Sequence, residues 1–146
     1  MYQTVSGANI IQTIEDLPKI PEEIDELFLD VETTSFDDSV EAFYPYMGHR
    51  VCGVAFSYTG AKGVYYLPVR HRKGKEPQEG NIPVEIYKDF FQRLLKVSKK
   101  WVNHNIKFDA HFFNVDSISF GDTQLVDTKT AAFMLDTEKL THSLKP

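Results

Sequence analysis

Residues 27–34 read Leu27-Phe28-Leu29-Asp30-Val31-Glu32-Thr33-Thr34. The short apolar run, bounded by polar residues, predicts a central β-strand. Asp30 and Glu32 are two positions apart, so on a strand both carboxylates lie on one face. Two adjacent carboxylates repel each other unless a positive charge compensates them, and a divalent cation with oxygen ligands commonly does so. The stretch predicts a strand that carries two metal ligands. A pair of acids merely exposed past a strand end is the simpler alternative.

The rest of the chain predicts strands first in a hairpin and then alternating with helices. Residues 51–58 and 63–69 are rich in β-branched and aromatic residues and read as the hairpin. Ile86, Phe90 and Leu94 recur every four residues, as on one face of a helix that starts near Pro83 and ends near Val97. The other expected elements are a short helix at 10–17, a surface loop at 70–82, strands at 101–103 and 118–120, and helices at 106–114 and 127–135, the last with Asp127 as N-cap.

Length and composition bound the fold to one globular domain. A chain of 146 residues, with 42% hydrophobic and 25% charged residues, is expected to form a single α/β domain over 1–146. The predicted order of elements indicates a mixed sheet, antiparallel strands followed by parallel ones, flanked by helices. The sequence shows neither a membrane-spanning apolar stretch nor a secretory signal, so we expect no membrane contact and a cytoplasmic protein. The single cysteine, Cys52, is expected to be a buried thiol.

The net charge of −5 excludes a dedicated nucleic-acid packaging protein, which needs a basic surface. It does not exclude a nuclease, because metal ions can meet the phosphate at an acidic site. Two basic patches, at 70–75 and at Lys96, Lys99 and Lys100, are expected to be solvated loop charges or to hold DNA.

A second informative stretch is Trp101-Val102-Asn103-His104-Asn105-Ile106-Lys107-Phe108-Asp109. It predicts a strand followed at once by a helix, with Asn105 and Asp109 four positions apart on one helical face. A third carboxylate at this point would face Asp30 and Glu32 from an adjacent strand end. In the alternative, Asn105 only caps the helix and Asp109 favours the positive end of its dipole.

Taken together, the two stretches resemble a known family. Residues 29–34 are similar to the first motif of the DEDD exonucleases, and 104–109 to the second. The closest likeness is to the 3′–5′ proofreading domain of family A DNA polymerases, those similar to bacterial DNA polymerase I. It extends over the chain, through 65–69, 120–123, 126–128 and 142–144. The resemblance implies a ribonuclease H-like sheet flanked by helices.

The resemblance also implies roles for individual residues. Asp30, Glu32 and Asp109 would be the catalytic residues and the ligands of two divalent cations, Mg²⁺ or Mn²⁺. The substrate-binding residues would be Thr33, Thr34, Phe36 and Asn105, of which Phe36 could instead pack beneath its loop. The implied reaction is two-metal-ion hydrolysis of the 3′-terminal phosphodiester of single-stranded DNA. Aromatic stacking and backbone contacts would suffice for sequence-tolerant binding of the DNA 3′ end.

The family's third motif, a tyrosine or histidine shortly before an aspartate, would lie beyond Leu144, and the sequence ends at Pro146. Asp122, Asp127, Asp136 and His142 lack the required spacing. We therefore expect a fold without its C-terminal helices, an incomplete metal site, weak or no activity in the isolated chain, and an exposed apolar patch or self-association. A polymerase domain or downstream segment would supply the motif. The alternatives are a degenerate exonuclease fold that binds DNA or protein without catalysis, and an RNA-processing relative.

Overall fold

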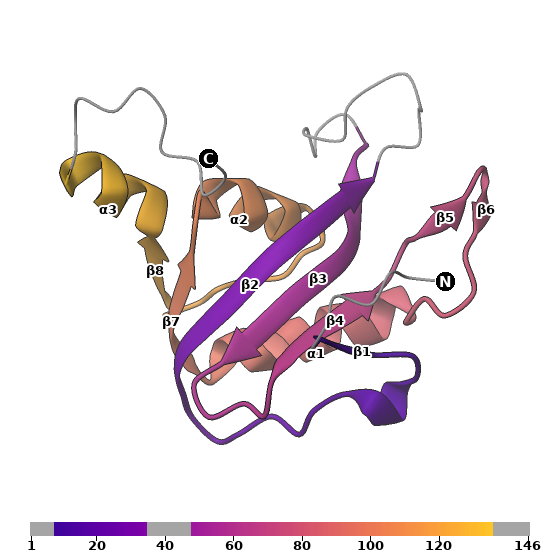
Figure 1. The fold of residues 1–146 in the computed structure, drawn as a ribbon, viewed down its shortest axis with the longest axis horizontal. Coiled ribbons are helices and arrows are strands. Elements are labelled where there is room, and N and C mark those ends of the chain that lie inside the picture. Colours follow the sequence, from indigo (N-terminus) through magenta and orange to yellow (C-terminus); the bar gives the residue numbers. More distant parts are fainter. Residues whose placement is uncertain (1–7, 35–47, 136–146) are drawn as a thin grey trace.

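The computed structural model describes residues 8–34 and 48–135 of the chain. Six strands form one mixed sheet in the order β1-β4-β3-β2-β7-β8 (Figure 1). Their bounds are β1 Ala8–Ile10, β2 Ile24–Thr34, β3 Arg50–Tyr58, β4 Val64–Pro68, β7 Ser98–Asn103 and β8 Gln124–Asp127. Two short strands, β5 (Arg72–Lys73) and β6 (Glu76–Pro77), form a separate hairpin.

Strand direction changes across the sheet. β2 pairs antiparallel with β3, and β3 antiparallel with β4, whereas β7 runs parallel to both β2 and β8. β1 runs parallel to β4 at the other edge. The predicted α/β class, with antiparallel strands followed by parallel ones and flanking helices, is confirmed.

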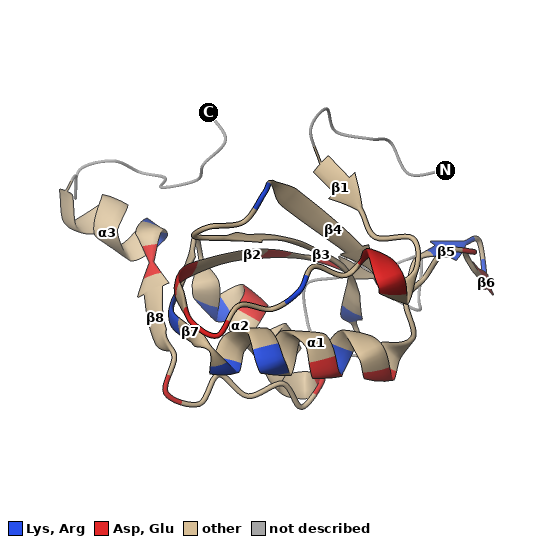
Figure 2. Cartoon of the chain, turned by 90° about the horizontal axis from the view of Figure 1, so that it is seen from below, with Lys and Arg blue, Asp and Glu red and all other residues tan. Residues whose placement is uncertain are grey.

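Two helices cover one face of the sheet. α1 (Val84–Lys96) and α2 (Ile106–Val115) lie on the same side of the strands (Figure 2). α1 buries Tyr87, Phe90, Phe91, Leu94 and Leu95. Of the repeat predicted from the sequence, Phe90 and Leu94 are buried and Ile86 is half-buried. Phe56 of β3 contacts Phe90 and Phe91 with ring centroids 5.4 and 5.3 Å apart. This aromatic core fixes α1 on the sheet.

The central strand β2 has two different faces. Leu27, Leu29 and Val31 are buried in the core, whereas Phe28, Asp30 and Glu32 are exposed on the opposite side. We call this opposite side the Asp30 face. Alternation with a period of two is the expected pattern for a strand with one packed face.

Three predictions of secondary structure are wrong. The expected helix at 10–17 is the strand β1 followed by a single 3₁₀ turn, Ile14–Asp16. The Asp16 carboxylate accepts the N–H groups of Gln12 and Thr13, which precede this turn. The expected loop at 70–82 contains the β5–β6 hairpin. The expected strand at 118–120 is not a strand, because Ile118 donates its N–H to Phe113 O and closes the end of α2.

The other elements agree with the sequence. α3 (Thr128–Leu135) begins where predicted, and Asp127 is its N-cap, since Asp127 Oδ1 accepts the Lys129 N–H at 2.9 Å. Cys52 is buried, and burial raises the pKa of its thiol to about 11. None of the helices within residues 8–34 and 48–135 has the length and apolar character needed to cross a membrane.

Candidate functional site

The carboxyl end of β2 carries the two acids of the first motif. Asp30 and Glu32 both lie on the Asp30 face, as their spacing predicts, and both are exposed. The pairing with β3 shifts between Glu32 and Thr33, so the strand is irregular directly after the acids. Such irregularities in a strand re-aim the side chains beside them. Two carboxylates are thereby presented side by side at a strand end.

The third acid lies at the start of α2. Asp109 sits in the first turn of this helix and is only 3% exposed. The Val31 N–H, between the two acids on β2, donates to its carboxylate, and the Asn103 amide donates to Asp109 Oδ2. β7 runs parallel to β2 with Val102 aligned to Phe28, so β7 ends and α2 begins beside the part of β2 that carries Asp30. Asp109 therefore lies close enough to β2 for the charges of Asp30 and Glu32 to act on its carboxyl.

The pKa of Asp109 is strongly raised. The pKa of its carboxyl is raised to about 8. Burial is the largest cause, and the negative charges of Asp30, Glu32 and Asp127 add to it, whereas the hydrogen bond from the Val31 N–H lowers the pKa. Burial and like charges both disfavour the ionised carboxylate, while a hydrogen bond to it favours ionisation. A carboxyl with a strongly raised pKa among other acids is typical of functional sites.

The donor chemistry of the three acids fits a divalent cation. Mg²⁺ and Mn²⁺ prefer carboxylate oxygens, and a cation would relieve the repulsion that raises the pKa of Asp109. Among the described residues, no three His, Cys, Asp or Glu side chains are already arranged closely enough to hold a metal ion. Asp109 instead faces two hydrogen-bond donors, Val31 N–H and the Asn103 amide.

The Asp127 side chain forms hydrogen bonds with the starts of both α2 and α3. Its Oδ1 accepts the Asn105 N–H at 2.9 Å as well as the Lys129 N–H. His104 lies between them and places its Nδ1 3.1 Å from Thr128 Oγ1. The first residues of α2 and α3 are thus held in one hydrogen-bonded cluster, and α2 carries Asp109.

The structure describes three of the four predicted substrate-binding residues, Thr33, Thr34 and Asn105. Thr33 and Thr34 are half-buried at the end of β2. Asn105 is exposed in the N-cap position of α2 with a φ of 61°, in the left-handed region that asparagine tolerates, and its side chain makes no capping hydrogen bond. Phe36 lies outside the described residues. The substrate roles of all four stay predictions.

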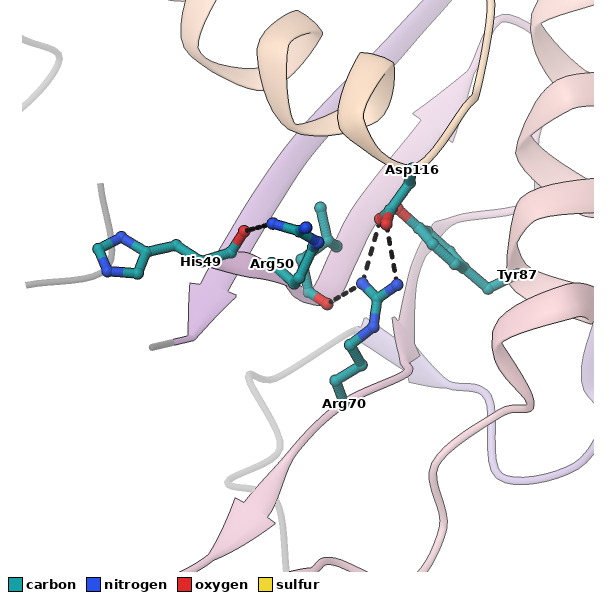
Figure 3. Close-up of polar contacts among 6 residues, drawn as sticks. His49, Arg50, Arg70, Tyr87 and Asp116 are labelled. Carbon is teal, nitrogen blue, oxygen red and sulfur yellow. Dashed lines mark hydrogen bonds and ion pairs between the residues drawn. The ribbon is translucent and has the colours of Figure 1, made fainter. Parts of the chain in front are cut away.

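A buried ion pair that the sequence did not reveal anchors the other end of α2. Arg70 donates from both terminal nitrogens to Asp116, at 2.8 and 3.1 Å, and to Val51 O at 2.9 Å (Figure 3). Tyr87 of α1 donates its hydroxyl to Asp116 Oδ2 at 2.9 Å. Asp116 follows the last turn of α2, so this cluster joins α2 to α1 and β3.

The basic patches are partly engaged in ion pairs. Arg70, the first residue of the 70–75 patch, is half-buried and pairs with the buried Asp116 rather than being a solvated charge. Lys99 pairs with Glu23 and Asp25 on the exposed surface. Two of the expected free cations therefore have carboxylate partners within the chain, which weakens the interpretation of these patches as DNA contacts.

An apolar hollow lies beside the acids on the Asp30 face. It has a volume of about 370 Å³ and is lined by Phe28, Asp30, Ser57, Val64, Val102 and His104, among others. Phe28 is 41% exposed and Val64 48% exposed. This apolar surface adjoins Asp30 directly. The self-association expected from the sequence stays a prediction.

The exposed Phe28 leads to a testable prediction. Phe28→Ser is expected to reduce concentration-dependent self-association of the chain, measured by sedimentation velocity, because it removes apolar surface from the hollow. The loss of unfolding free energy should stay within about 1 kcal/mol, since the side chain is already partly in water. Leu125→Ser is the matched control: Leu125 is 40% exposed but aligns with Trp101 on the opposite face. Equal association of both variants and the wild type would contradict the prediction.

No family model matches the sequence, and a search of curated proteins found no match.

Proposed function

We propose that this chain is the proofreading-type 3′–5′ exonuclease domain of a DNA polymerase, with a ribonuclease H-like fold. The observation that carries the proposal is the buried Asp109, whose pKa is raised first by burial and then by the charges of Asp30 and Glu32. The sheet order, with antiparallel strands leading into parallel ones, is compatible with that fold. The resemblance of residues 29–34 and 104–109 to two exonuclease motifs supports the assignment.

In this proposal each residue has a defined task. Asp30, Glu32 and Asp109 would hold two divalent cations, Mg²⁺ or Mn²⁺, which activate a water and stabilise the leaving 3′ oxygen during hydrolysis of a terminal phosphodiester. Asp109 must give up its proton to become a ligand, so the raised pKa couples cation binding to proton release. Thr33, Thr34, Phe36 and Asn105 would contact the 3′-terminal nucleotides of single-stranded DNA.

The proposal includes a fourth carboxylate, supplied by a polymerase domain or another downstream segment. The three acids present come from β2 and the start of α2. Divalent cations take six or more oxygen ligands, so three carboxylates leave coordination positions for other ligands. Loss of a ligand weakens metal binding and can cost orders of magnitude in rate. We therefore expect weak or no hydrolysis by residues 1–146 alone, and metal binding is the more direct test.

The test is Mn²⁺ binding, measured by isothermal titration calorimetry at pH 8. Asp30→Ala is expected to weaken binding by at least about 10-fold, since even residues that only support metal ligands have effects of that size. Asp25→Ala is the matched control, because Asp25 lies on the same strand but pairs with Lys99 at the surface. Equal Mn²⁺ affinity in Asp30→Ala and wild type would refute the metal site.

The second candidate is a non-catalytic binding module, favoured by the apolar hollow beside Asp30. A module of this kind would bind DNA or protein without metal, and substitution of the three acids would leave binding unchanged. Matched DNA and RNA oligonucleotides, compared in the same assay, separate proofreading from RNA processing, because the three acids can serve either sugar.

A further inference from the structure

A tyrosine and a histidine form a close pair on the Asp30 face. Tyr66 Oη lies 2.6 Å from His71 Nε2, and the two rings are 5.9 Å apart between centroids at 48°. Tyr66 belongs to β4, and His71 follows β4 in the chain. The proposed reaction has so far assigned neither residue a role.

The strand register places this pair beside the acids. Asp30 aligns with Ala55 of β3, and Ala55 aligns with Tyr66 of β4, so the three residues form one row across the sheet. In the adjacent row, Glu32 aligns with Gly53. Residues at matching register positions point to the same face. Tyr66 therefore lies on the same face as both acids, in the row of Asp30.

The side chain of Tyr66 leans over Gly53 toward Glu32. A Cβ at position 53 would lie 2.0 Å from Tyr66 Oη, 2.5 Å from its Cζ and 3.1 Å from His71 Nε2. No side chain other than the hydrogen of glycine fits below the hydroxyl. Neighbouring strands are about 4.8 Å apart, so the hydroxyl stands roughly one strand spacing from the backbone of Glu32.

His71 is held in place by backbone hydrogen bonds. Its N–H donates to Asn81 Oδ1 at 3.0 Å, and its carbonyl accepts from Asn81 Nδ2 at 2.9 Å and from the Gln78 N–H at 2.8 Å. Burial lowers the pKa of His71, which favours the neutral imidazole over the charged one. A neutral imidazole offers one donor and one acceptor nitrogen. In the tautomer that carries the proton on Nε2, His71 donates to Tyr66 Oη, and the tyrosine can then donate its own proton to a bound ligand.

We propose that Tyr66 is a substrate-binding residue of the same site and that His71 positions it. The Tyr66 hydroxyl donates a hydrogen bond to a non-bridging oxygen of the phosphodiester held at Asp30, Glu32 and Asp109. This inference rests on the proposed function, because it needs a phosphodiester at the acids. A purely structural role is the alternative: an aromatic ring that covers a glycine on the neighbouring strand stabilises a sheet without touching a ligand.

The test separates the hydroxyl from the ring. Binding of a 5′-fluorescein-labelled oligodeoxythymidylate is measured by fluorescence anisotropy with Mn²⁺ present. Tyr66→Phe keeps the ring over Gly53 and is expected to raise Kd about 10-fold, the size of a lost hydrogen bond to a charged group, with an unchanged melting temperature. Tyr65→Phe is the matched control, because Tyr65 stacks on Phe56 at 5.3 Å on the packed face.

Two further measurements test the hydrogen bond itself. His71→Leu is expected to bind as weakly as Tyr66→Phe, whereas His71→Gln, which keeps an amide near Nε2, restores affinity. With a methylphosphonate at the terminal linkage, which removes the charged oxygen, wild type and Tyr66→Phe should bind equally. A purely structural role would not produce this dependence on one phosphate oxygen.

The outcomes distinguish the two proposals. Wild-type affinity in Tyr66→Phe, together with loss of Mn²⁺-dependent binding in Asp30→Ala, would overturn the role of Tyr66 and leave the proposed function standing. Wild-type affinity in Asp30→Ala, or no DNA binding by the wild type, would overturn the proposed function and this inference with it.

Discussion

Asp116→Ala is expected to lower the free energy of unfolding by about 3–5 kcal/mol, the range seen when one partner of a buried ion pair is removed. Asp116 is 3% exposed and accepts hydrogen bonds from Arg70 and Tyr87. Its loss leaves the Arg70 guanidinium, 18% exposed, without its carboxylate. Urea unfolding followed by circular dichroism measures the change.

The controls for Asp116 separate charge from packing. Asp122→Ala, in an exposed position, should change stability by no more than about 0.5 kcal/mol. Arg70→Met combined with Asp116→Leu removes both charges and should recover part of the loss, because an apolar pair needs no compensation. A loss below about 1 kcal/mol in Asp116→Ala would show that the pair does not hold α2 in place.

Asp109→Asn is expected to gain free energy of unfolding relative to the wild type as the pH rises from about 4 to about 8, because the wild type loses stability over this range. The folded-state pKa of Asp109 is about 8, well above its ordinary value of 3.8. Between these two pH values the unfolded chain releases the proton and the folded chain keeps it, so wild-type stability falls as the pH rises. The asparagine does not titrate, and the difference between the proteins should grow by about 1–3 kcal/mol over this range.

The measurement is urea unfolding of both proteins at pH 5 and pH 8 without added metal. The comparison between the two pH values cancels any constant cost of placing an amide beside Asn103. Saturating Mn²⁺ at pH 8 should then favour the wild type, because the cation binds the ionised carboxylate. A difference between the proteins that does not change with pH would mean that Asp109 ionises normally in the folded chain.

Local patterns in the sequence predicted most of the elements that position the site. The apolar run around Leu29 predicted β2, and the repeat of Phe90 and Leu94 predicted α1, because each pattern has the period of the structure that it forms. β8 was missed because only half of Gln124–Asp127 is apolar, whereas the preceding residues at 118–120 look more like a strand. Its pairing with β7 is decided by the sheet rather than by its own composition.

The candidate site was predictable in part. The proximity of Asp109 to Asp30 followed from two motifs at the ends of neighbouring strands, and the raised pKa of Asp109 is in accord with it. The pair Arg70–Asp116 had no local signal, because its residues are 46 positions apart and neither occupies a characteristic motif. The position of Tyr66 over Gly53 likewise depends on strand register, which the sequence does not state.

The two hydrogen bonds accepted by Asp127 have a mechanical consequence. Asp127 Oδ1 accepts the N–H of Asn105, the N-cap of α2, and the N–H of Lys129 in the first turn of α3. A movement of one helix start relative to the other therefore breaks one of these hydrogen bonds. α3 carries Leu135, 89% exposed, at its far end, while α2 carries Asp109 in its first turn. A displacement of α3 would therefore strain the Asp127–Asn105 hydrogen bond at the start of the helix that carries Asp109.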